Sequence, residues 1–160
     1  MAHRDIMLRS GRVAGAVGTK PTVVTKFVIE QFPETIPILD FGAGKFRQQS
    51  IILEAEGYGV QSFDLEENME LYPPSAMIRG NIMKPVCMLS NVLNVQENTG
   101  AILDLVDRIF DVFNPMVIVA NYPKSPRYPV PNRKELIEIL GRTKSVMEFE
   151  RTRAFLIWKE

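Results

Sequence analysis

Cysteine and histidine are almost absent from this chain of 160 residues, in which Cys87 and His3 each stand alone. A single cysteine forms no intrachain disulfide, and one cysteine with one histidine supplies too few ligands for a zinc site, so no metal is predicted. An unpaired thiol is typical of a reducing compartment, and we expect a cytoplasmic protein. Cys87 lies between the apolar residues Val86 and Met88, which favours a buried small hydrophobe over a nucleophile.

A long apolar run and a net charge are also missing. No stretch approaches the roughly 20 apolar residues that a membrane-spanning helix needs, so no membrane partner is expected. The 19 basic residues balance the 19 acidic ones, which removes a general attraction to polyanions. Basic residues nevertheless gather in residues 1–26 and 123–134, and the second range contains no acid. By charge, an anionic acceptor or a nucleic-acid acceptor is therefore an open alternative. The sequence leaves open whether the protein forms a homo-oligomer.

Strand-like and helix-like patterns alternate along the chain. Its length and its 46% hydrophobic content fit one domain, with residues 1–20 as an N-terminal extension. The alternation predicts an α/β protein, a Rossmann-like three-layer sandwich whose mostly parallel sheet ends in an antiparallel C-terminal hairpin. Strands are expected near residues 38–41, 60–64, 76–78, 86–90, 116–120, 146–150 and 154–158, and helices near 21–31, 47–56, 102–113 and 133–140.

The first strand, 38–41, runs into the turn Gly42-Ala43-Gly44 and then into a helix. The two glycines let the backbone turn sharply and approach a ligand closely. The helix that follows offers free amide groups and the positive end of its dipole, where a carboxylate or a phosphate can bind. We expect this helix to bury Ile51, Ile52 and Ala55 and to be capped by Gly57.

Asp64 lies 20 residues beyond Gly44, at the end of the next predicted strand and before Leu65. An acid at this place accepts hydrogen bonds from the two hydroxyls of an adenosine ribose. The dinucleotide fingerprint also needs a third glycine, but Arg47 occupies that position, and its long side chain would crowd a pyrophosphate. The pattern therefore favours a nucleoside ligand other than a dinucleotide.

Asp40 precedes Gly42 by two residues, and a carboxylate there can hold the ammonium group of an amino-acid ligand. A ligand with both a ribose and an amino acid is S-adenosylmethionine. The run Asp40-Phe41-Gly42-Ala43-Gly44-Lys45, followed by Phe63-Asp64, resembles motifs I and II of class I S-adenosylmethionine-dependent methyltransferases. The resemblance spans residues 36–122, and it departs from the family at Phe46, where a third glycine is common.

The resemblance implies a set of cofactor-binding residues. Gly42 and Gly44 would line the methionine part, Asp64 would hold the ribose, and Asn81 would contact the adenine edge. Ser90 and Asn91 would face the methyl group. Asp40 and the adjacent residues Ala43 and Leu65 complete the predicted set. The predicted cofactor-binding residues are Asp40, Gly42, Ala43, Gly44, Asp64, Leu65, Asn81, Ser90 and Asn91.

The acceptor is less clearly marked. Enzymes that methylate DNA-base amines carry a (D/N/S)PP(Y/F) motif after the fourth strand, whereas Ser90-Asn91-Val92-Leu93 stands here without the prolines and the aromatic ring. We interpret residues 121–128 as the acceptor-side loop, with Asn121 and Tyr122 as candidate catalytic residues; an ordinary rigid loop is the alternative. Thr19-Lys20-Pro21 resembles a short motif that precedes motif I in some DNA methyltransferases. The candidate substrate-binding residues are Lys20, Lys124 and Arg127.

Three functions remain open at this point. The first is in-line methyl transfer to an unidentified acceptor, which needs little acid-base machinery because the sulfonium is already activated. The second keeps the pocket but degrades or sequesters the cofactor. The third is a nucleic-acid-binding module in which the glycine turn is purely structural and binding falls steeply with salt.

Overall fold

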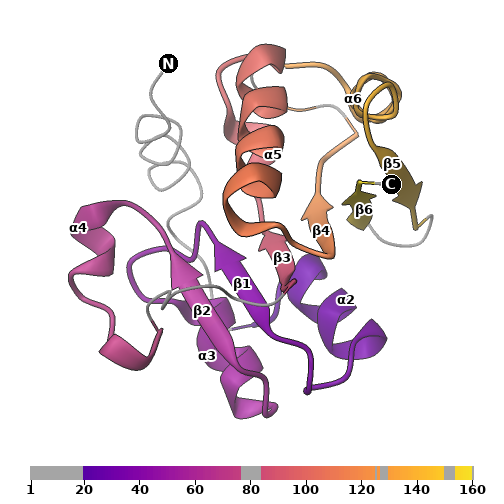
Figure 1. The fold of residues 1–160 in the computed structure, drawn as a ribbon. Helices are drawn as coiled ribbons and strands as arrows, with labels where there is room; N and C mark the ends of the chain where they lie inside the picture. The colour runs from indigo at the N-terminus through magenta and orange to yellow at the C-terminus, as the bar shows by residue number, and fades with distance from the viewer. Residues whose placement is uncertain (1–19, 77–83, 125, 127–129, 150–153, 160) are drawn as a thin grey trace.

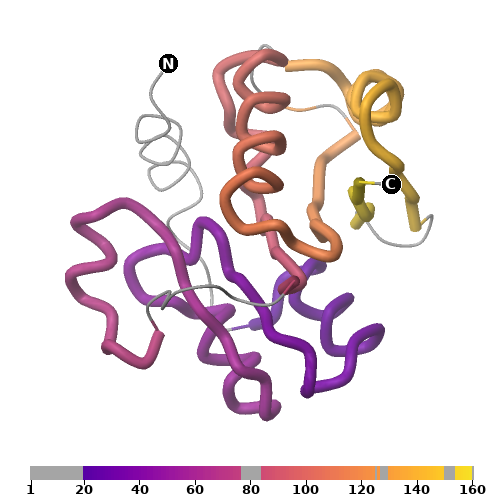
Figure 2. Tube along the Cα trace, viewed as in Figure 1, coloured from indigo at the N-terminus to yellow at the C-terminus, as the bar shows by residue number. Residues whose placement is uncertain are grey.

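The computed structural model describes residues 20–76, 84–124, 126, 130–149 and 154–159 (Figures 1 and 2). Asn81 and Arg127 therefore lie outside the described residues, as do two of the three residues of the strand expected at 76–78. The elements in chain order are α2 (Val23–Gln31), β1 (Ile38–Phe41), α3 (Gln48–Ala55), β2 (Val60–Phe63), α4 (Glu66–Met69), the 3-10 turn η1 (Pro74–Ala76), β3 (Val86–Leu89), the 3-10 turn η2 (Leu93–Val95), α5 (Thr99–Phe113), β4 (Val117–Asn121), α6 (Arg133–Leu140), β5 (Ser145–Glu148) and β6 (Ala154–Trp158).

The strands form one mixed sheet in the order β2-β1-β3-β4-β6-β5. The first four strands of this order are parallel, and β6 runs antiparallel to both β4 and β5. The prediction of a parallel sheet extended by an antiparallel hairpin is confirmed. The order is not strictly Rossmann-like, because β6 is inserted between β4 and β5.

Helices cover both faces of the sheet (Figure 1). Successive residues of a strand point to opposite faces, so Ile38 packs with α2 and α3 while Leu39 packs with α5 and α6. The longest helix, α5, begins where Asn98 Oδ1 accepts a hydrogen bond from Ala101 N at 2.8 Å. It ends at Asn114, whose φ is 45°. Its predicted apolar stripe is buried at Ile102, Leu105, Val106 and Ile109.

Two local predictions are wrong. Ala76 closes the turn η1 instead of beginning a strand. The inward face of α3 carries Gln49, Ser50 and Leu53, while the predicted core residue Ile51 is 50% exposed. Polar side chains are tolerated on this face because β1, β2 and the start of α2 offer them hydrogen-bond partners.

Gly57 follows the end of α3 as expected. Its φ is 98°, its N–H donates to Glu54 O at 3.0 Å, and Tyr58 N donates to Leu53 O at 3.1 Å. These two bonds form a Schellman motif, in which glycine is favoured because the left-handed conformation has no Cβ penalty. The motif thus ends α3 at Ala55, shortly before β2 begins at Val60.

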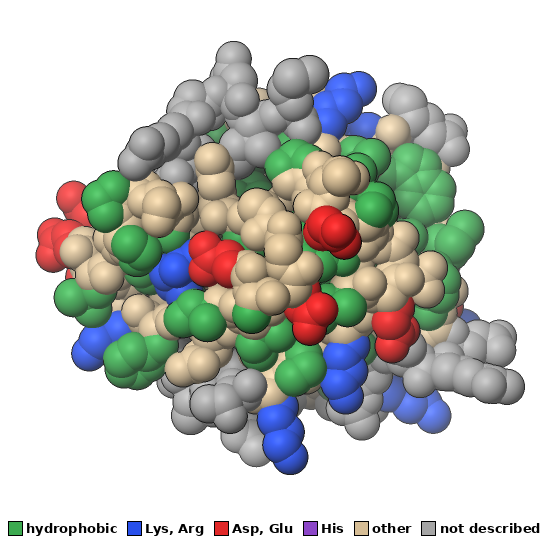
Figure 3. Space-filling model, turned by 90° about the horizontal axis from the view of Figure 1, so that it is seen from below, with side chains coloured by type: hydrophobic (Ala, Val, Ile, Leu, Met, Phe, Trp, Pro, Cys, Tyr) green, Lys and Arg blue, Asp and Glu red, His purple; other side chains and the backbone are tan. Residues whose placement is uncertain are grey.

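The surface of the described part has a mixed character. On the face seen in Figure 3, acidic and basic side chains are interspersed among apolar ones. No helix among the described residues is long and apolar enough to cross a membrane.

Candidate cofactor and acceptor site

The glycine turn follows the carboxyl end of β1. Gly42 and Gly44 have φ values of 83° and 81°, a conformation that other residues adopt only with strain. Gly42 N and Ala43 N both donate to Phe63 O, at 2.8 and 3.1 Å. A Cβ added at Gly44 would meet no described heavy atom within 4 Å outside the adjacent residues. The turn is therefore fixed to the end of β2 and open at Gly44.

The peptide groups of Gly44 are held from two sides. Gly44 N donates to Asp64 Oδ2, and the Tyr72 hydroxyl donates to Gly44 O. Asp64 Oδ1 accepts from Leu65 N at 2.7 Å. Burial raises the pKa of Asp64, and these backbone hydrogen bonds oppose the rise. The structure thus brings the predicted acid and the predicted turn into direct contact.

Tyr72 was missed by sequence reasoning. It lies between α4 and η1, where no helical or strand period marks an inward position. Burial raises its pKa, so the hydroxyl stays protonated and able to donate to Gly44 O. Leu65 has its side chain in the core on the α5 side, and so only its backbone faces the Asp64 carboxylate.

Asp40 lies behind the turn, in a polar cluster between β1, β2 and α3. It is 2% exposed, and Ser50 Oγ donates to its Oδ2 at 2.6 Å. Ser50 Oγ is also 2.7 Å from Ser62 Oγ, which accepts from Arg47 Nε at 2.8 Å. Burial raises the pKa of Asp40 to about 6, although the Ser50 hydrogen bond and the Arg47 charge oppose the shift. The carboxylate of Asp40 is therefore enclosed in this cluster, where its described hydrogen-bond partner is Ser50.

Arg47 occupies the place of the third glycine in the dinucleotide fingerprint. Its φ is 52°, so its backbone has the left-handed conformation that glycine adopts without strain. Its side chain is buried: Nη2 donates to Glu54 Oε1 at 3.0 Å, and the guanidinium lies 5.7 Å from the Tyr72 ring centre. The side chain thus fills the space between α3 and β2.

A second network joins the start of α2 to the end of β3. Thr22 Oγ1 lies 2.6 Å from Ser90 Oγ, a hydrogen bond between the two hydroxyls. Gln49 Oε1 accepts from Thr22 N at 3.0 Å and from Thr25 Oγ1 at 2.6 Å, and Gln49 Nε2 donates to Lys20 O at 3.1 Å. The backbone of Lys20 is therefore fixed beside the predicted site, and its side chain is exposed.

Asn91 and Asn121, at the ends of the neighbouring strands β3 and β4, bind one another. Asn91 N donates to Asn121 Oδ1 and Asn121 Nδ2 donates to Asn91 Oδ1, each at 2.6 Å. Asn91 is left-handed, with a φ of 58°. A predicted cofactor residue and a predicted acceptor residue thus meet in one contact.

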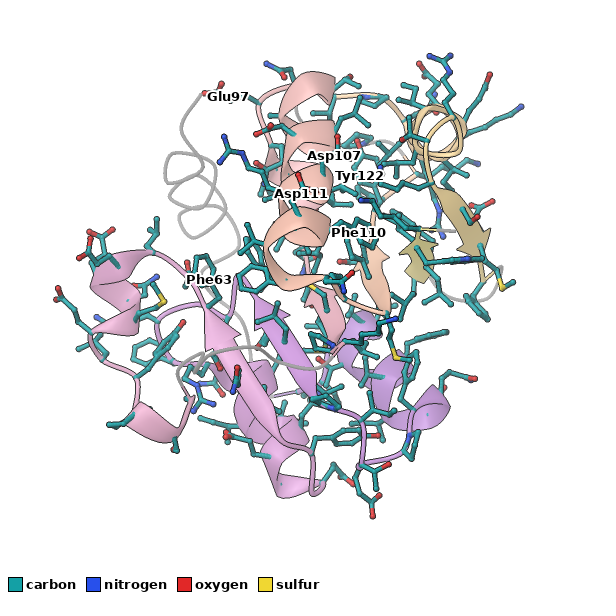
Figure 4. All side chains as sticks on the ribbon, in the orientation of Figure 1. Phe63, Glu97, Asp107, Phe110, Asp111 and Tyr122 are labelled. Carbon is teal, nitrogen blue, oxygen red and sulfur yellow. The ribbon has the colours of Figure 1, made fainter. Side chains whose placement is uncertain are left out.

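Tyr122 belongs to the core (Figure 4). It is 0% exposed, and its hydroxyl donates to Pro131 O at 2.6 Å. Burial, with a smaller contribution from Glu135, raises its pKa to about 12. A ring without exposed surface does not reach an acceptor, so we assign Tyr122 to anchoring the loop. Lys124 is exposed on that loop.

The described side chains offer hydrogen-bonding chemistry without a metal centre. Across the described ranges, no group of three or more His, Cys, Asp or Glu side chains could hold a metal ion. Cys87 is fully buried, and its burial raises the pKa of its thiol. The groups that these strand ends present are backbone amides, carboxylates and side-chain amides.

Comparisons with known proteins bear on the fold. No family model matches the sequence, and no curated protein matches it. The chain is similar to a chain of the E. cuniculi Mtq2-Trm112 complex, responsible for the methylation of the eRF1 translation termination factor. The TM-score is 0.52 and the identity 13%, over 88% of this chain and 98% of that chain.

The chain is also similar to the pyocyanin biosynthetic protein PhzM, with a TM-score of 0.50 and 12% identity. That match covers 84% of this chain and 53% of PhzM, so this chain spans about half of it. At such identities the likeness concerns the fold. The protein has an α/β fold shared with methyltransferase structures.

Proposed function

We propose that this protein binds S-adenosylmethionine at the carboxyl ends of its parallel strands and transfers the methyl group in line to an acceptor beside β3 and β4. One observation carries the proposal. The positive-φ glycine turn after β1 is hydrogen-bonded to the carboxylate that ends β2, through Gly44 N and Asp64 Oδ2. An aminoacyl nucleoside needs a close backbone approach and a ribose-binding acid side by side.

The residues present fit this cofactor. Gly44 is open on its outer side, so a ligand can approach its backbone. Asp64 accepts two backbone N–H groups and a side-chain hydrogen bond from Asn68, which leaves one of the about four acceptor sites of a carboxylate for a ribose hydroxyl. The cofactor supplies a methyl group that its sulfonium already activates. This chain therefore contributes binding and alignment, which account for much of the rate in such a transfer.

The similarity of the fold to methyltransferase structures supports the proposal of a methyltransferase. The Mtq2 structure contains a second protein, Trm112, so a protein partner stays within the proposal. The nucleic-acid alternative gains little from the face in Figure 3, where charges of both signs are interspersed. Cofactor degradation or sequestration would use the same binding residues, and analysis of the products distinguishes these functions from methyl transfer.

Calorimetric titration with S-adenosylhomocysteine tests the proposal. The parent should bind, and Asp64→Ala should bind at least about tenfold more weakly, since a lost hydrogen bond to a charged group costs about 1.5 to 3 kcal/mol. Asp104→Ala is the matched control, because Asp104 pairs with Arg108 on the exposed side of α5. No binding by the parent, or equal binding by the Asp64 variant, contradicts the proposal.

Mass spectrometry of the protein with S-adenosylmethionine separates the two classes of enzyme. A methyltransferase releases S-adenosylhomocysteine only when an acceptor is present. Consumption of the cofactor without an acceptor would instead establish a degrading enzyme.

A further inference from the structure

The contact between Asn91 and Asn121 fixes which way both amides point. Asn91 N is a backbone donor, so the Asn121 atom that it meets at 2.6 Å must be the carbonyl oxygen. The remaining Asn121 atom is then the amide nitrogen, and the Asn91 atom that it meets at 2.6 Å must be Oδ1. Both side-chain oxygens are therefore turned toward each other's residue.

This arrangement leaves donors at the ends of β3 and β4. Asn91 Nδ2 has two N–H groups, and it donates to no other atom in the described part of the chain. Asn91 is half-buried, and its backbone N–H is also bonded to Asn121 Oδ1. The Asn91 amide is thus held in place, and both N–H groups of Asn91 Nδ2 and the second N–H of Asn121 Nδ2 donate to no described atom.

The same strand ends supply no base. Residues 84–96 and 116–134 contain no Asp, Glu or His. Cys87 and Tyr122 of these ranges are 0% exposed. Asp40 lies in β1 behind the glycine turn, Asp64 follows β2, and each accepts hydrogen bonds from residues around the turn. An alkylamine acceptor is protonated at neutral pH and must lose a proton before it attacks, and these two ranges offer it no carboxylate or imidazole base. Their oxygen acceptors, Ser90 Oγ and the second lone pairs of the two amide oxygens, are neutral.

A carboxylate acceptor needs no base. It is already ionised at neutral pH, and one of its oxygens can accept hydrogen bonds from an amide NH₂. Lys124, exposed on the loop after β4, and Lys20, fixed through Gln49, add positive charge to this side of the molecule. The NH₂ group of Asn91, the positive charges of Lys20 and Lys124, and the lack of a base all favour an acceptor that has an anionic oxygen.

We infer that the methyl acceptor is a carboxylate, one oxygen of which is bound by Asn91 Nδ2. The inference rests on the proposed function. The other carboxylate oxygen attacks the methyl carbon, the carbon–oxygen bond forms, and the carbon–sulfur bond breaks with its electron pair on sulfur. The products are a methyl ester and a neutral thioether, and no proton is transferred.

NMR titration of the ¹⁵N-labelled protein loaded with S-adenosylhomocysteine tests this inference. Benzoate should shift the side-chain amide resonances of Asn91 to saturation, and benzylamine should leave them unmoved. Asn132, which caps α6 by accepting from Glu135 N at 2.9 Å, supplies a control amide that neither probe should shift. N-acetylglutamate α-amide is titrated in parallel as a mimic of an acidic protein side chain. Its affinity, compared with that of benzoate, shows whether the carboxylate belongs to a protein side chain or to a small aromatic acid.

Asn91→Asp is the decisive variant. It keeps the oxygen that accepts from Asn121 Nδ2, tolerates the left-handed backbone, and replaces the free NH₂ by a carboxylate oxygen. With parent and variant both saturated with S-adenosylhomocysteine, benzoate should bind the variant at least about tenfold more weakly, a loss of about 1.4 kcal/mol.

The outcomes separate the two proposals. Failure to bind S-adenosylhomocysteine overturns both. Cofactor binding with Asn91 resonances that respond to benzylamine, or to neither probe, overturns the carboxylate inference alone. Equal benzoate affinity in the parent and in Asn91→Asp also overturns the carboxylate inference alone.

Discussion

Replacement of Arg47 by alanine and by glycine tests the polar cluster beneath the turn and its backbone separately. Both variants lose the Ser62 hydrogen bond at 2.8 Å, the Glu54 ion pair at 3.0 Å and the contact with the Tyr72 ring. The buried bond contributes about 1.5 kcal/mol, and the half-exposed ion pair and the ring contact about 0.5 to 1 kcal/mol each. We expect Arg47→Ala to lower the free energy of unfolding by about 3 kcal/mol.

The glycine variant should be less damaged than the alanine variant. The φ of 52° at Arg47 strains any residue that has a Cβ by about 1 to 2 kcal/mol, whereas glycine adopts it freely. Glycine also raises the entropy of the unfolded chain, which offsets about 0.4 to 1 kcal/mol of that relief. Taken at their mid-values, the two contributions make Arg47→Gly more stable than Arg47→Ala by about 0.8 kcal/mol.

Urea unfolding followed by far-ultraviolet circular dichroism measures both effects, from midpoints compared at a common slope. Glu138, exposed within α6, supplies the control, since an interior helical position should show the opposite order, with alanine more stable than glycine by about 1 kcal/mol. An Arg47→Ala variant within 0.5 kcal/mol of the parent would refute the role of the cluster. An alanine variant at least as stable as the glycine variant would refute the backbone argument.

Three further perturbations address the rest of the site. Tyr72→Phe removes the hydroxyl bound to Gly44 O, and a lost neutral hydrogen bond of about 1 kcal/mol should weaken S-adenosylhomocysteine binding about fivefold by calorimetry; an unchanged affinity contradicts its positioning role. The pKa of Asp40 rises from 3.8 to about 6 on folding, so the folded state binds the proton more tightly and stability falls as the pH rises from about 4 through 6. Asp40→Asn should lack this loss, and urea unfolding at pH 4 and pH 7 should show the parent losing about 2.4 kcal/mol relative to the variant; parallel behaviour of the two proteins refutes it. Gln49→Met removes three hydrogen bonds to residues 20–25, so the Thr22 amide should exchange its hydrogen at least about tenfold faster, while the Ala101 amide, capped by Asn98, keeps the parent rate.

The sequence predicted the parts of the site that depend on local pattern. Gly42 and Gly44 stand between an apolar strand and a helix, and only a backbone that reaches positive φ explains two glycines there. Asp64 ends the next strand of the same unit, and parallel strands bring their carboxyl ends to one edge, so its contact with the turn followed from chain order. The stripe of α5 was equally clear, because one face of that helix is apolar throughout.

The remaining features depend on contacts between residues distant in the chain. The polar face of α3 is buried because Ser50 and Gln49 find partners on β1 and before α2, and no local period reveals such partners. Tyr72 reaches Gly44 across 28 positions of sequence. Tyr122 looked like an acceptor residue because an aromatic ring followed a strand end, yet tertiary packing took its ring into the core.

The insertion of β6 between β4 and β5 has a consequence for the order of folding. During synthesis β4 is complete at Asn121, but its pairing partner begins only at Ala154. Until then the apolar residues Val117, Ile118 and Val119 present an unpaired strand edge, the kind of surface on which nascent chains associate. Because β6 follows β5 in the chain and lies between β4 and β5 in the sheet, the shielding of the β4 edge must wait for it.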